Sequence, residues 1–444
     1  MSALWTAEEL TGLFGAGWDI SGISIDTRSL QPGDLFVALQ GERDGHDFCA
    51  AAFAKGAAAA MVSCPVEGNI ILVPDVLKAL EALGRAARAR SAAKAVAVTG
   101  SVGKTTVKEM LRRIFSAFGP VHAAEASFNN HIGVPLTLAR MPRETAFGVF
   151  EIGMNHPGEI APLAALVRPD VAIVTCVDRA HLGLMGSELA IAKEKASIYT
   201  ALRPGGKAVL PGETAYLQML RESVPAGHCA LLFNGPEARL LDMQSGPETS
   251  EIAAEILDRK IYFRLAAPGR HMASNALAAL TAAAALGLDV GEAAEALSGF
   301  AAFAGRGARR VLALPDGGSA LLLDESYNAS SASMLAAFSV LKLQPGRHVA
   351  VLGDMLELGA HAQAEHLALA AALRDSADLV FAAGPYSGAL FDSLPRAMQG
   401  AHASDAATLA PMVKAALRDG DAVLVKGSYG SRMRDVISAL ESSG

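Results

Sequence analysis

One eight-residue run constrains the fold of this chain more than any other feature. It reads Thr99-Gly100-Ser101-Val102-Gly103-Lys104-Thr105-Thr106. An apolar stretch, residues 95–98, comes directly before the run, and a helical pattern begins directly after it at Val107. A strand that turns through two glycines into a helix headed by Lys-Thr-Thr is typical of a phosphate-binding loop, or P-loop. The alternative is an ordinary glycine-rich turn, and the combination of strand, Gly-Lys-Thr and helix argues against it.

The residue types in this run explain how it would hold a nucleotide. Glycines let backbone N–H groups approach phosphate oxygens, and the helix N-terminus adds a partial positive charge. Lys104 would neutralise the distal phosphates, and the Thr105 hydroxyl would bind the Mg²⁺ that accompanies the nucleotide. The usual P-loop has one further glycine, at the position that Val98 occupies here. The residues predicted to bind the phosphates are Gly100, Ser101, Val102, Gly103, Lys104, Thr105 and Thr106.

Length, charge and cysteine content exclude several classes of protein. A chain of 444 residues is long enough for two to four domains. The net charge of −7, with no long basic run, argues against a nucleic-acid binder. The acidic N-terminus is not a secretory signal, and the longest apolar run, residues 276–288, is too short to span a membrane. Scattered cysteines without a Cys-x-x-Cys pair fit a reducing cytoplasm, namely Cys49, Cys64, Cys176 and Cys229.

Short apolar runs alternate with helical patterns from about residue 94 onward. Residues 95–98, 147–152 and 171–177 have the length and composition of buried parallel strands. Residues 236–265 are more typical of short strands with turns, in an inserted or edge region. After Gly305-Arg306-Gly307 the alternation restarts, which predicts a second doubly wound domain. The predicted domains are residues 1–90, 91–308 and 309–444.

Polar residues stand where the predicted central strands end. Glu151 lies at the end of residues 147–152, and His181 follows residues 171–177. Because parallel strands end at the same edge of a sheet, both side chains are expected near the phosphates, where a carboxylate and an imidazole suit a metal ion. The alternatives are that Glu151 caps a helix and that His181 is an ordinary loop histidine.

Other polar segments are candidates for substrate contact. The N-terminal turn around Arg28 is suited to a diphosphate, although a salt-bridged turn explains it equally well. A polar loop around residue 130 precedes a helix, and three further polar segments, at residues 324–328, 353–355 and 426–428, follow strands of the C-terminal domain. The predicted substrate-binding residues are Ser24, Asp26, Thr27, Arg28, Asn129, Asn130, Tyr327, Asn328, Lys426 and Ser428.

Together these motifs resemble those of the Mur ligases, which form amide bonds at the expense of ATP in bacterial cell-wall precursor synthesis. The resemblance extends from Asp26-Thr27-Arg28 to Lys426-Gly427-Ser428, and it accounts for Val98, because this family's P-loop lacks the first glycine. It implies an α/β protein of three domains: a small α/β N-terminal domain that binds a UDP-linked substrate, a central P-loop ATPase domain with a mainly parallel sheet, and a Rossmann-like C-terminal domain.

The resemblance also assigns cofactors, substrates and roles. It implies ATP and Mg²⁺ as cofactors, UDP-N-acetylmuramoyl-tripeptide and D-alanyl-D-alanine as substrates, and a monomer without nucleic-acid or membrane partners. Lys195, four residues before Tyr199, matches a lysine that is carbamylated in these ligases, and its neighbours Lys193 and Glu194 are expected to be dispensable. The implied catalytic residues are Lys104, Glu151, His181 and Lys195, and the implied metal ligands are Thr105, Glu151, His181 and Lys195. Asn275, Arg306 and Asp324 match nucleotide-binding positions.

The chain departs from the family pattern at four positions, and two other functions remain open. The family commonly has an asparagine where this chain has Met272, and an Asn-Pro pair where it has Ser330 and Ser331. It also commonly has an arginine at the position of Tyr429. A folylpolyglutamate synthase-like ligase would share the chemistry but act on a folate, and the N-terminal block argues against it. A P-loop switch without an amide product would hydrolyse nucleotide independently of any peptide.

Overall fold

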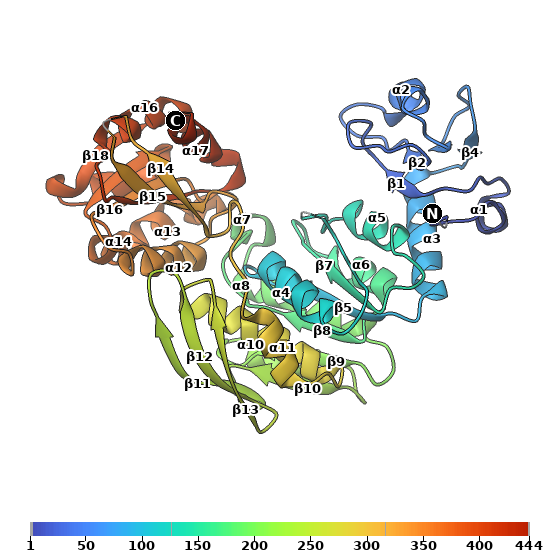
Figure 1. The fold of residues 1–444 in the computed structure, drawn as a ribbon, viewed down its shortest axis with the longest axis horizontal. Helices are drawn as coiled ribbons and strands as arrows, with labels where there is room; N and C mark the ends of the chain where they lie inside the picture. Colours follow the sequence, from blue (N-terminus) through green and yellow to red (C-terminus); the bar gives the residue numbers. More distant parts are fainter. Residues whose placement is uncertain (1–2, 126, 316, 443–444) are drawn as a thin grey trace.

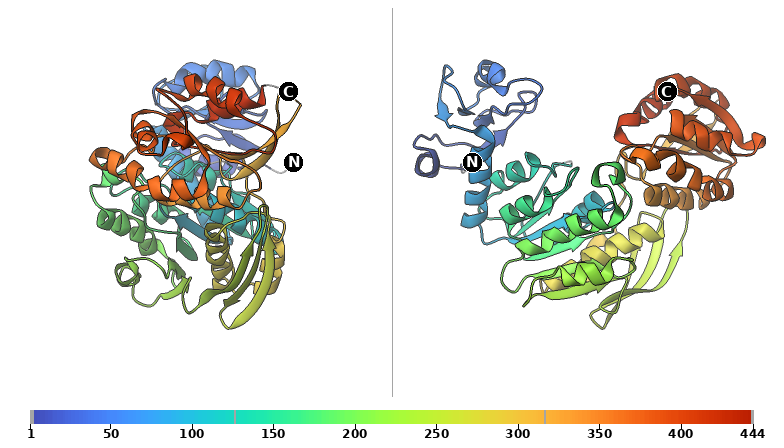
Figure 2. Two further views of the ribbon diagram at one scale, coloured as in Figure 1. Left: turned by 90° about the vertical axis from the view of Figure 1, so that its left-hand side faces the viewer. Right: turned by 180° about the vertical axis from the view of Figure 1, so that it is seen from behind.

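The computed structural model describes residues 3–125, 127–315 and 317–442. It contains three β-sheets, each built mainly of parallel strands and accompanied by helices. The predicted three-domain α/β fold is thereby confirmed. The N-terminal and C-terminal domains lie at opposite ends of the central domain (Figure 1), and Figure 2 shows the same arrangement from behind. Within the described ranges, no helix is both long and apolar enough to cross a membrane.

The N-terminal domain is a four-stranded parallel sheet in the order β1-β2-β3-β4. Helix α3 begins after Asp75, whose carboxylate accepts a hydrogen bond from the backbone of Lys78. Such a side-chain cap satisfies one of the free N–H groups at a helix start. The elements are α1 (Ala7–Phe14), β1 (Gly22–Ser24), β2 (Asp34–Val37), α2 (Cys49–Ala54), β3 (Ala59–Val62), β4 (Ile70–Leu72) and α3 (Val76–Arg90).

Helix α3 of the N-terminal domain packs against the central domain. It packs against α5 (Gly133–Ala139) so closely that a Cβ on Gly84 would lie 3.1 Å from the Pro135 carbonyl oxygen. The Trp5 indole, buried nearby, donates to the Ala139 carbonyl at 2.9 Å. Leu136 joins the apolar core of the N-terminal domain. Shared burial of this kind orients the two domains relative to each other.

The central sheet has nine strands in the order β13-β12-β11-β10-β9-β8-β5-β7-β6. Its strands β5 to β10 run parallel. Strands β11 to β13 are antiparallel to one another and lie at one edge of the sheet, where residues 236–265 were expected as strands of an inserted or edge region. Val98 of β5 pairs with Glu151 of β7, and Thr99 pairs with Val174 of β8, so these strands end together. The strands are β5 (Lys94–Thr99), β6 (Val121–Ala123), β7 (Phe147–Glu151), β8 (Val171–Val174), β9 (Lys207–Pro211), β10 (Cys229–Phe233), β11 (Ala238–Ser245), β12 (Ser250–Ile256) and β13 (Arg259–Leu265).

Helices cover both faces of the central sheet. Alternate residues of β5 serve the two faces, with Val96 and Val98 in one apolar core and Ala95 and Ala97 in the other. The first core packs against α4 (Lys104–Ser116), α10 (Arg270–Ala285) and α11 (Val290–Leu297), and the second packs against α5, α6 (Ile160–Val167) and α8 (Glu188–Ala196). Most of the apolar run from residue 276 lies in α10 and is buried there, as expected. Two short helices, α7 (Leu182–Met185) and α9 (Leu217–Glu222), complete the domain.

The C-terminal domain is a six-stranded sheet in the order β14-β15-β19-β16-β17-β18. Its strands are parallel except for β14, an antiparallel edge strand that the sequence patterns did not predict, as they did not predict β18. The strands are β14 (Ala308–Ala313), β15 (Ser319–Glu325), β16 (His348–Gly353), β17 (Leu379–Ala383), β18 (Gln399–Ala403) and β19 (Ala422–Lys426). The helices are α12 (Ser331–Lys342), α13 (Ala362–Ala368), α14 (Ala370–Ser376), α15 (Pro385–Asp392), α16 (Ala406–Ala416) and α17 (Arg434–Glu441).

Candidate active site

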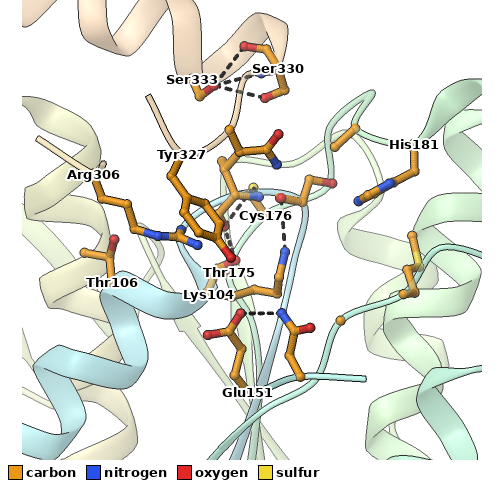
Figure 3. Close-up of a pocket in the computed structure, with 18 of the residues that line it drawn as sticks. Lys104, Thr106, Glu151, Thr175, Cys176, His181, Arg306, Tyr327, Ser330 and Ser333 are labelled. Atoms are coloured by element: carbon orange, nitrogen blue, oxygen red, sulfur yellow. Dashed lines mark hydrogen bonds between the residues drawn. The ribbon is translucent and has the colours of Figure 1, made fainter. Parts of the chain in front are cut away.

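A cavity of about 760 Å³ lies between the central and C-terminal domains. The P-loop, the ends of β7 and β8 and the start of α10 line it from the central domain. The segment around Arg306, the residues after β15 and Lys426 line it from the C-terminal side. Figure 3 shows side chains from both domains directed into this space. The cavity is therefore the point where a nucleotide held by the P-loop would meet groups of the C-terminal domain.

The P-loop requires glycine at two positions. Gly100 and Gly103 have φ angles of +149° and +84°, which other residues rarely adopt. A Cβ on Gly100 would overlap the Thr175 hydroxyl, and a Cβ on Gly103 would lie 2.5 Å from Oδ1 of Asn275. Val98, by contrast, is fully buried within β5, before the chain begins to turn. The missing glycine therefore falls in the strand and leaves the turn itself intact.

Lys104 lies at the start of α4, inside the loop. Its Nζ donates to the carbonyl oxygens of Gly100 and Ser101 at 2.7 and 3.3 Å. Burial lowers the pKa of Lys104, and the positive charge of Arg306 acts in the same direction, whereas Glu151 opposes both. Negative phosphate groups in the cavity would stabilise the charged form of this lysine.

Glu151 ends β7 and connects the P-loop to the neighbouring loop. Only 1% of the residue is exposed. Its Oε2 accepts a hydrogen bond from the Thr105 hydroxyl at 2.8 Å, and its Oε1 accepts one from Asn129 Nδ2 at 2.7 Å. Glu151 therefore belongs to the loop cluster around the P-loop, and its carboxylate caps none of the helices that the structure describes. A carboxylate beside a P-loop hydroxyl is a set of hard oxygen donors that suits Mg²⁺.

His181 follows β8 and also lines the cavity. It has a left-handed backbone with φ of 65°, and its Nδ1 lies 2.5 Å from Glu357 Oε2 of the C-terminal domain. This contact lowers the pKa of Glu357. Among the described residues, no three His, Cys, Asp or Glu side chains are grouped as metal ligands, so Glu151 and His181 do not form such a cluster. The assignment of His181 as a metal ligand stays a prediction.

Lys195 lies near the end of α8 and is only 2% exposed. Burial and the nearby charge of Lys104 lower its pKa to about 7. Lys193 is exposed, as expected for a residue on another helix face. Glu194, in contrast, accepts hydrogen bonds from the backbone N–H groups of Gly158 and Ile160, each at 2.8 Å. Because Glu194 supports the start of α6, its replacement is expected to disturb the fold, unlike that of Lys193.

The C-terminal domain and the segment that leads into it supply cations and aromatic groups to the cavity. Arg306 lies over the Tyr327 ring (Figure 3), and its guanidinium carbon is 4.2 Å from the ring centre. Lys426 is buried, which lowers its pKa; its Nζ lies 3.4 Å from Glu325 Oε2 and donates to the Asn328 carbonyl at 3.0 Å. Several predicted residues therefore share this cavity. They are Ser101, Val102, Gly103, Lys104, Thr106, Asn129, Asn130, Glu151, His181, Asn275, Arg306, Tyr327, Asn328 and Lys426.

Two residues predicted to bind nucleotide or substrate, Asp324 and Ser428, are hydrogen-bonded to other parts of the C-terminal region and do not face the cavity. The buried Asp324 carboxylate accepts hydrogen bonds from the Gly305 backbone at 2.9 Å and from Arg310 at 2.6 Å. Ser428 accepts a hydrogen bond from the Leu356 backbone at 2.9 Å. Neither residue is among those that line the cavity in the described part of the chain. They hold the chain around the site in place.

The N-terminal turn lies apart from the cavity. Arg28 and Asp26 form a salt bridge of 2.6 Å, which holds the pKa of Asp26 at about 2. The Arg28 side chain is 89% exposed, and Lys55 donates to the nearby Thr27 carbonyl at 2.7 Å. The salt-bridged turn foreseen as an alternative is therefore present. To hold an anionic ligand, the exposed guanidinium would use its remaining N–H groups or exchange this contact with Asp26.

The loop after β8 bridges the central and C-terminal domains. The Asp178 carboxylate accepts a hydrogen bond from the Ser330 hydroxyl at 3.2 Å, and Arg179 Nη1 lies 2.5 Å from Glu365 Oε1. Ser331 donates to the same Glu365 carboxylate at 2.6 Å. Two of the residues that depart from the family pattern thus hold the C-terminal domain against the loop that carries His181.

Three residues with clear roles in the site were not predicted. The Thr175 hydroxyl donates to the Val102 carbonyl at 2.5 Å, and the Cys176 thiol accepts a hydrogen bond from the Val102 N–H at 3.3 Å. Glu325 faces Lys426. Their positions at the ends of β8 and β15 are the signal that would have found them, because ligand sites of parallel sheets lie there.

Comparison with known protein families identifies the class to which this fold and site belong. The Mur ligase middle domain matches residues 98–283. The Mur ligase glutamate ligase domain matches residues 309–429, and the Mur ligase catalytic domain matches residues 19–95. The chain belongs to the Mur ligase family.

Individual relatives are similar over nearly the whole chain. The UDP-N-acetylmuramoyl-tripeptide–D-alanyl-D-alanine ligase of Escherichia coli is 36% identical over 97% of this chain and 96% of its own. A crystal structure of MurF from Acinetobacter baumannii, 30% identical, covers 99% of both chains with a TM-score of 0.88. MurF from Thermotoga maritima in complex with ADP, 27% identical, covers 95% of this chain and 97% of its own with a TM-score of 0.81.

Proposed function

We propose that this chain is an ATP-dependent ligase that joins D-alanyl-D-alanine to UDP-N-acetylmuramoyl-tripeptide in the cytoplasm, as a monomer. The observation that carries the proposal is a cavity that the P-loop and residues of the C-terminal domain line together. A ligase of this type must bring ATP, a carboxylate and an amine together, and the cavity has walls from two domains with which to do so. The near full-length similarity to ligases of that name supports the choice of substrates.

The proposed reaction has two steps. An oxygen of the tripeptide's terminal carboxylate attacks the γ-phosphorus of ATP, which forms an acyl phosphate and releases ADP. The amine of D-alanyl-D-alanine then attacks the acyl carbon, and the tetrahedral intermediate loses phosphate as the amide bond forms. Crowded anions must be neutralised and aligned throughout.

Cations and oxygen ligands of this chain are placed to meet those demands. Lys104 and Arg306 line the cavity and carry the positive charge that the transferring phosphoryl group requires. Thr105 and Glu151 offer oxygen atoms for Mg²⁺, which would add further charge neutralisation. Enclosure of the site between two domains would limit hydrolysis of the acyl phosphate.

Product identification tests the proposal. The protein would be incubated with ATP, Mg²⁺, D-alanyl-D-alanine and candidate UDP-linked tripeptides, and products analysed by mass spectrometry together with phosphate release. We expect a UDP-linked pentapeptide and one phosphate per amide bond. Ligation to a folate substrate instead would favour the folylpolyglutamate synthase-like alternative. Phosphate release that is independent of any peptide would favour a nucleotide switch.

Arg28 is expected to serve the UDP-linked substrate and not ATP. Replacement of Arg28 by alanine removes an exposed guanidinium, paired with Asp26 in this structure, whose N–H donors suit a diphosphate. Loss of such a charge-assisted contact predicts roughly a tenfold rise in KM for the UDP-tripeptide. Steady-state kinetics with each substrate varied in turn would measure this effect. Lys78→Ala, which removes an exposed cation from the same domain, is the control, and a rise confined to the KM for ATP would contradict the assignment.

A further inference from the structure

A row of four side chains, in which two aromatic rings lie between two guanidinium groups, leads outward from the cavity. Arg306 lies 4.2 Å from the centre of the Tyr327 ring, and the ring centres of Tyr327 and Tyr429 are 5.9 Å apart. The Arg434 guanidinium carbon in turn lies 4.4 Å from the centre of Tyr429. Arg306 and Tyr327 line the cavity, whereas Tyr429 and Arg434 are exposed. The row therefore connects the nucleotide end of the site with the surface of the C-terminal domain.

The turn that carries Tyr429 is held in place by hydrogen bonds. The Ser428 N–H donates to the Asp354 carbonyl at 3.1 Å, and the Ser431 hydroxyl donates to the Ser428 carbonyl at 2.6 Å. Tyr429 itself is 58% exposed, so burial in a core does not explain the position of its ring. The contacts of the Tyr429 ring with Tyr327 and Arg434 explain its position instead. The turn thus presents Tyr429 as a fixed platform for the Arg434 side chain.

Arg434 differs from the neighbouring cations in its freedom to bind an anion. Lys426 faces Glu325, and Arg432 lies 2.9 Å from a carboxylate oxygen of Asp435. In the ranges that the structure describes, no carboxylate lies within ion-pair distance of Arg434. A guanidinium that stacks on an aromatic ring keeps its N–H donors directed outward, where they match a carboxylate.

We propose that Arg434, supported by Tyr429, binds the free carboxylate of the incoming dipeptide. This role rests on the proposed function, in which a dipeptide is the acceptor. A dipeptide spans at most about 7 Å from end to end. By way of Tyr429, the centre of the Tyr327 ring lies no farther than about 10 Å from the Arg434 guanidinium carbon, a gap that the dipeptide and its carboxylate–guanidinium contact can bridge together. With its carboxylate at Arg434, the amine of the dipeptide would lie beside Tyr327 at the cavity. Arg434 would thereby select acceptors with a free C-terminal carboxylate.

Steady-state kinetics with D-alanyl-D-alanine and its C-terminal amide test this role. The matched variants are Arg434→Gln and, as control, Arg432→Gln, which removes a neighbouring exposed guanidinium already paired with Asp435. We expect Arg434→Gln to raise KM for D-alanyl-D-alanine about tenfold, the usual effect of losing a charge-assisted hydrogen bond. KM values for ATP and the UDP-tripeptide should not change. The wild type should prefer the acid over the amide by a similar factor, and Arg434→Gln should lose that preference.

Each other outcome has a distinct meaning. An unchanged KM for the dipeptide, or a preference for the acid that survives in Arg434→Gln, would overturn the proposal. A rise in KM for the UDP-tripeptide alone would overturn it as well, because Arg434 would then bind a carboxylate of the other substrate. Failure of the wild type to ligate either acceptor would contradict the proposed function itself, and the proposed role of Arg434 would fall with it.

Discussion

Replacement of Lys104 by alanine is expected to abolish ligation while the protein remains folded. Lys104 lies at the start of α4, and its Nζ donates hydrogen bonds to two loop carbonyl oxygens, so its loss removes little apolar packing. Its charge, in contrast, lies where the transferring phosphoryl group would be held. Loss of one such stabilising group in an enclosed site lowers kcat by on the order of 10³-fold.

Rates of amide formation, measured beside circular dichroism and thermal unfolding, would check this result. Lys193→Ala is a suitable control, since it removes an exposed lysine of the same domain. A Lys104→Ala protein that unfolds would show that the residue has a structural role. Near-wild-type turnover in a folded variant would show that the P-loop is not the phosphoryl-transfer site.

Replacement of Lys195 by alanine is expected to remove most of the activity. We propose that this lysine is carbamylated: its neutral amine attacks CO₂, an N–C bond forms and one proton is released. The product is an anion with two oxygens, which would suit Mg²⁺ better than an ammonium group close to Lys104. A pKa of about 7 makes the neutral amine accessible near neutral pH.

The sign of the pH dependence follows from that pKa. Below about pH 7 the Lys195 amine is mostly protonated and cannot react, and above it the neutral form predominates. At a fixed partial pressure of CO₂, the carbamylated fraction and the activity should therefore rise as the pH increases through this value. ¹³C NMR with labelled CO₂ should detect a carbamate carbon that is absent from Lys195→Ala.

Rescue and control variants sharpen this prediction. A small carboxylate such as acetate should restore part of the activity of Lys195→Ala by filling the space that the side chain leaves. Lys193→Ala should behave as the wild type, whereas Glu194→Ala should lose stability, because Glu194 holds the start of α6. Full activity of the wild type in CO₂-free buffer would contradict the carbamylation.

Local sequence determined much of the fold and the nucleotide end of the site. The two glycines of the P-loop, the apolar strand before it and the helix after it depend on backbone conformation and burial within a few residues. Glu151 could be located as well, because adjacent parallel strands end at one edge of a sheet and Val98 pairs with Glu151. Periodicity likewise revealed four of the six C-terminal strands, which are short apolar runs.

Tertiary structure alone decided how the domains meet. The partners of Asp178, Arg179 and His181 lie more than 150 residues away in sequence, at Ser330, Glu365 and Glu357. Nothing in the local pattern distinguishes Glu194, which supports α6, from a solvated helix charge. Strand β14 was missed because an edge strand packs less of its surface than a central one and so carries little apolar signal; its Val311 is exposed. Contacts of this kind depend on the relative placement of distant elements, which the burial of apolar faces between domains determines.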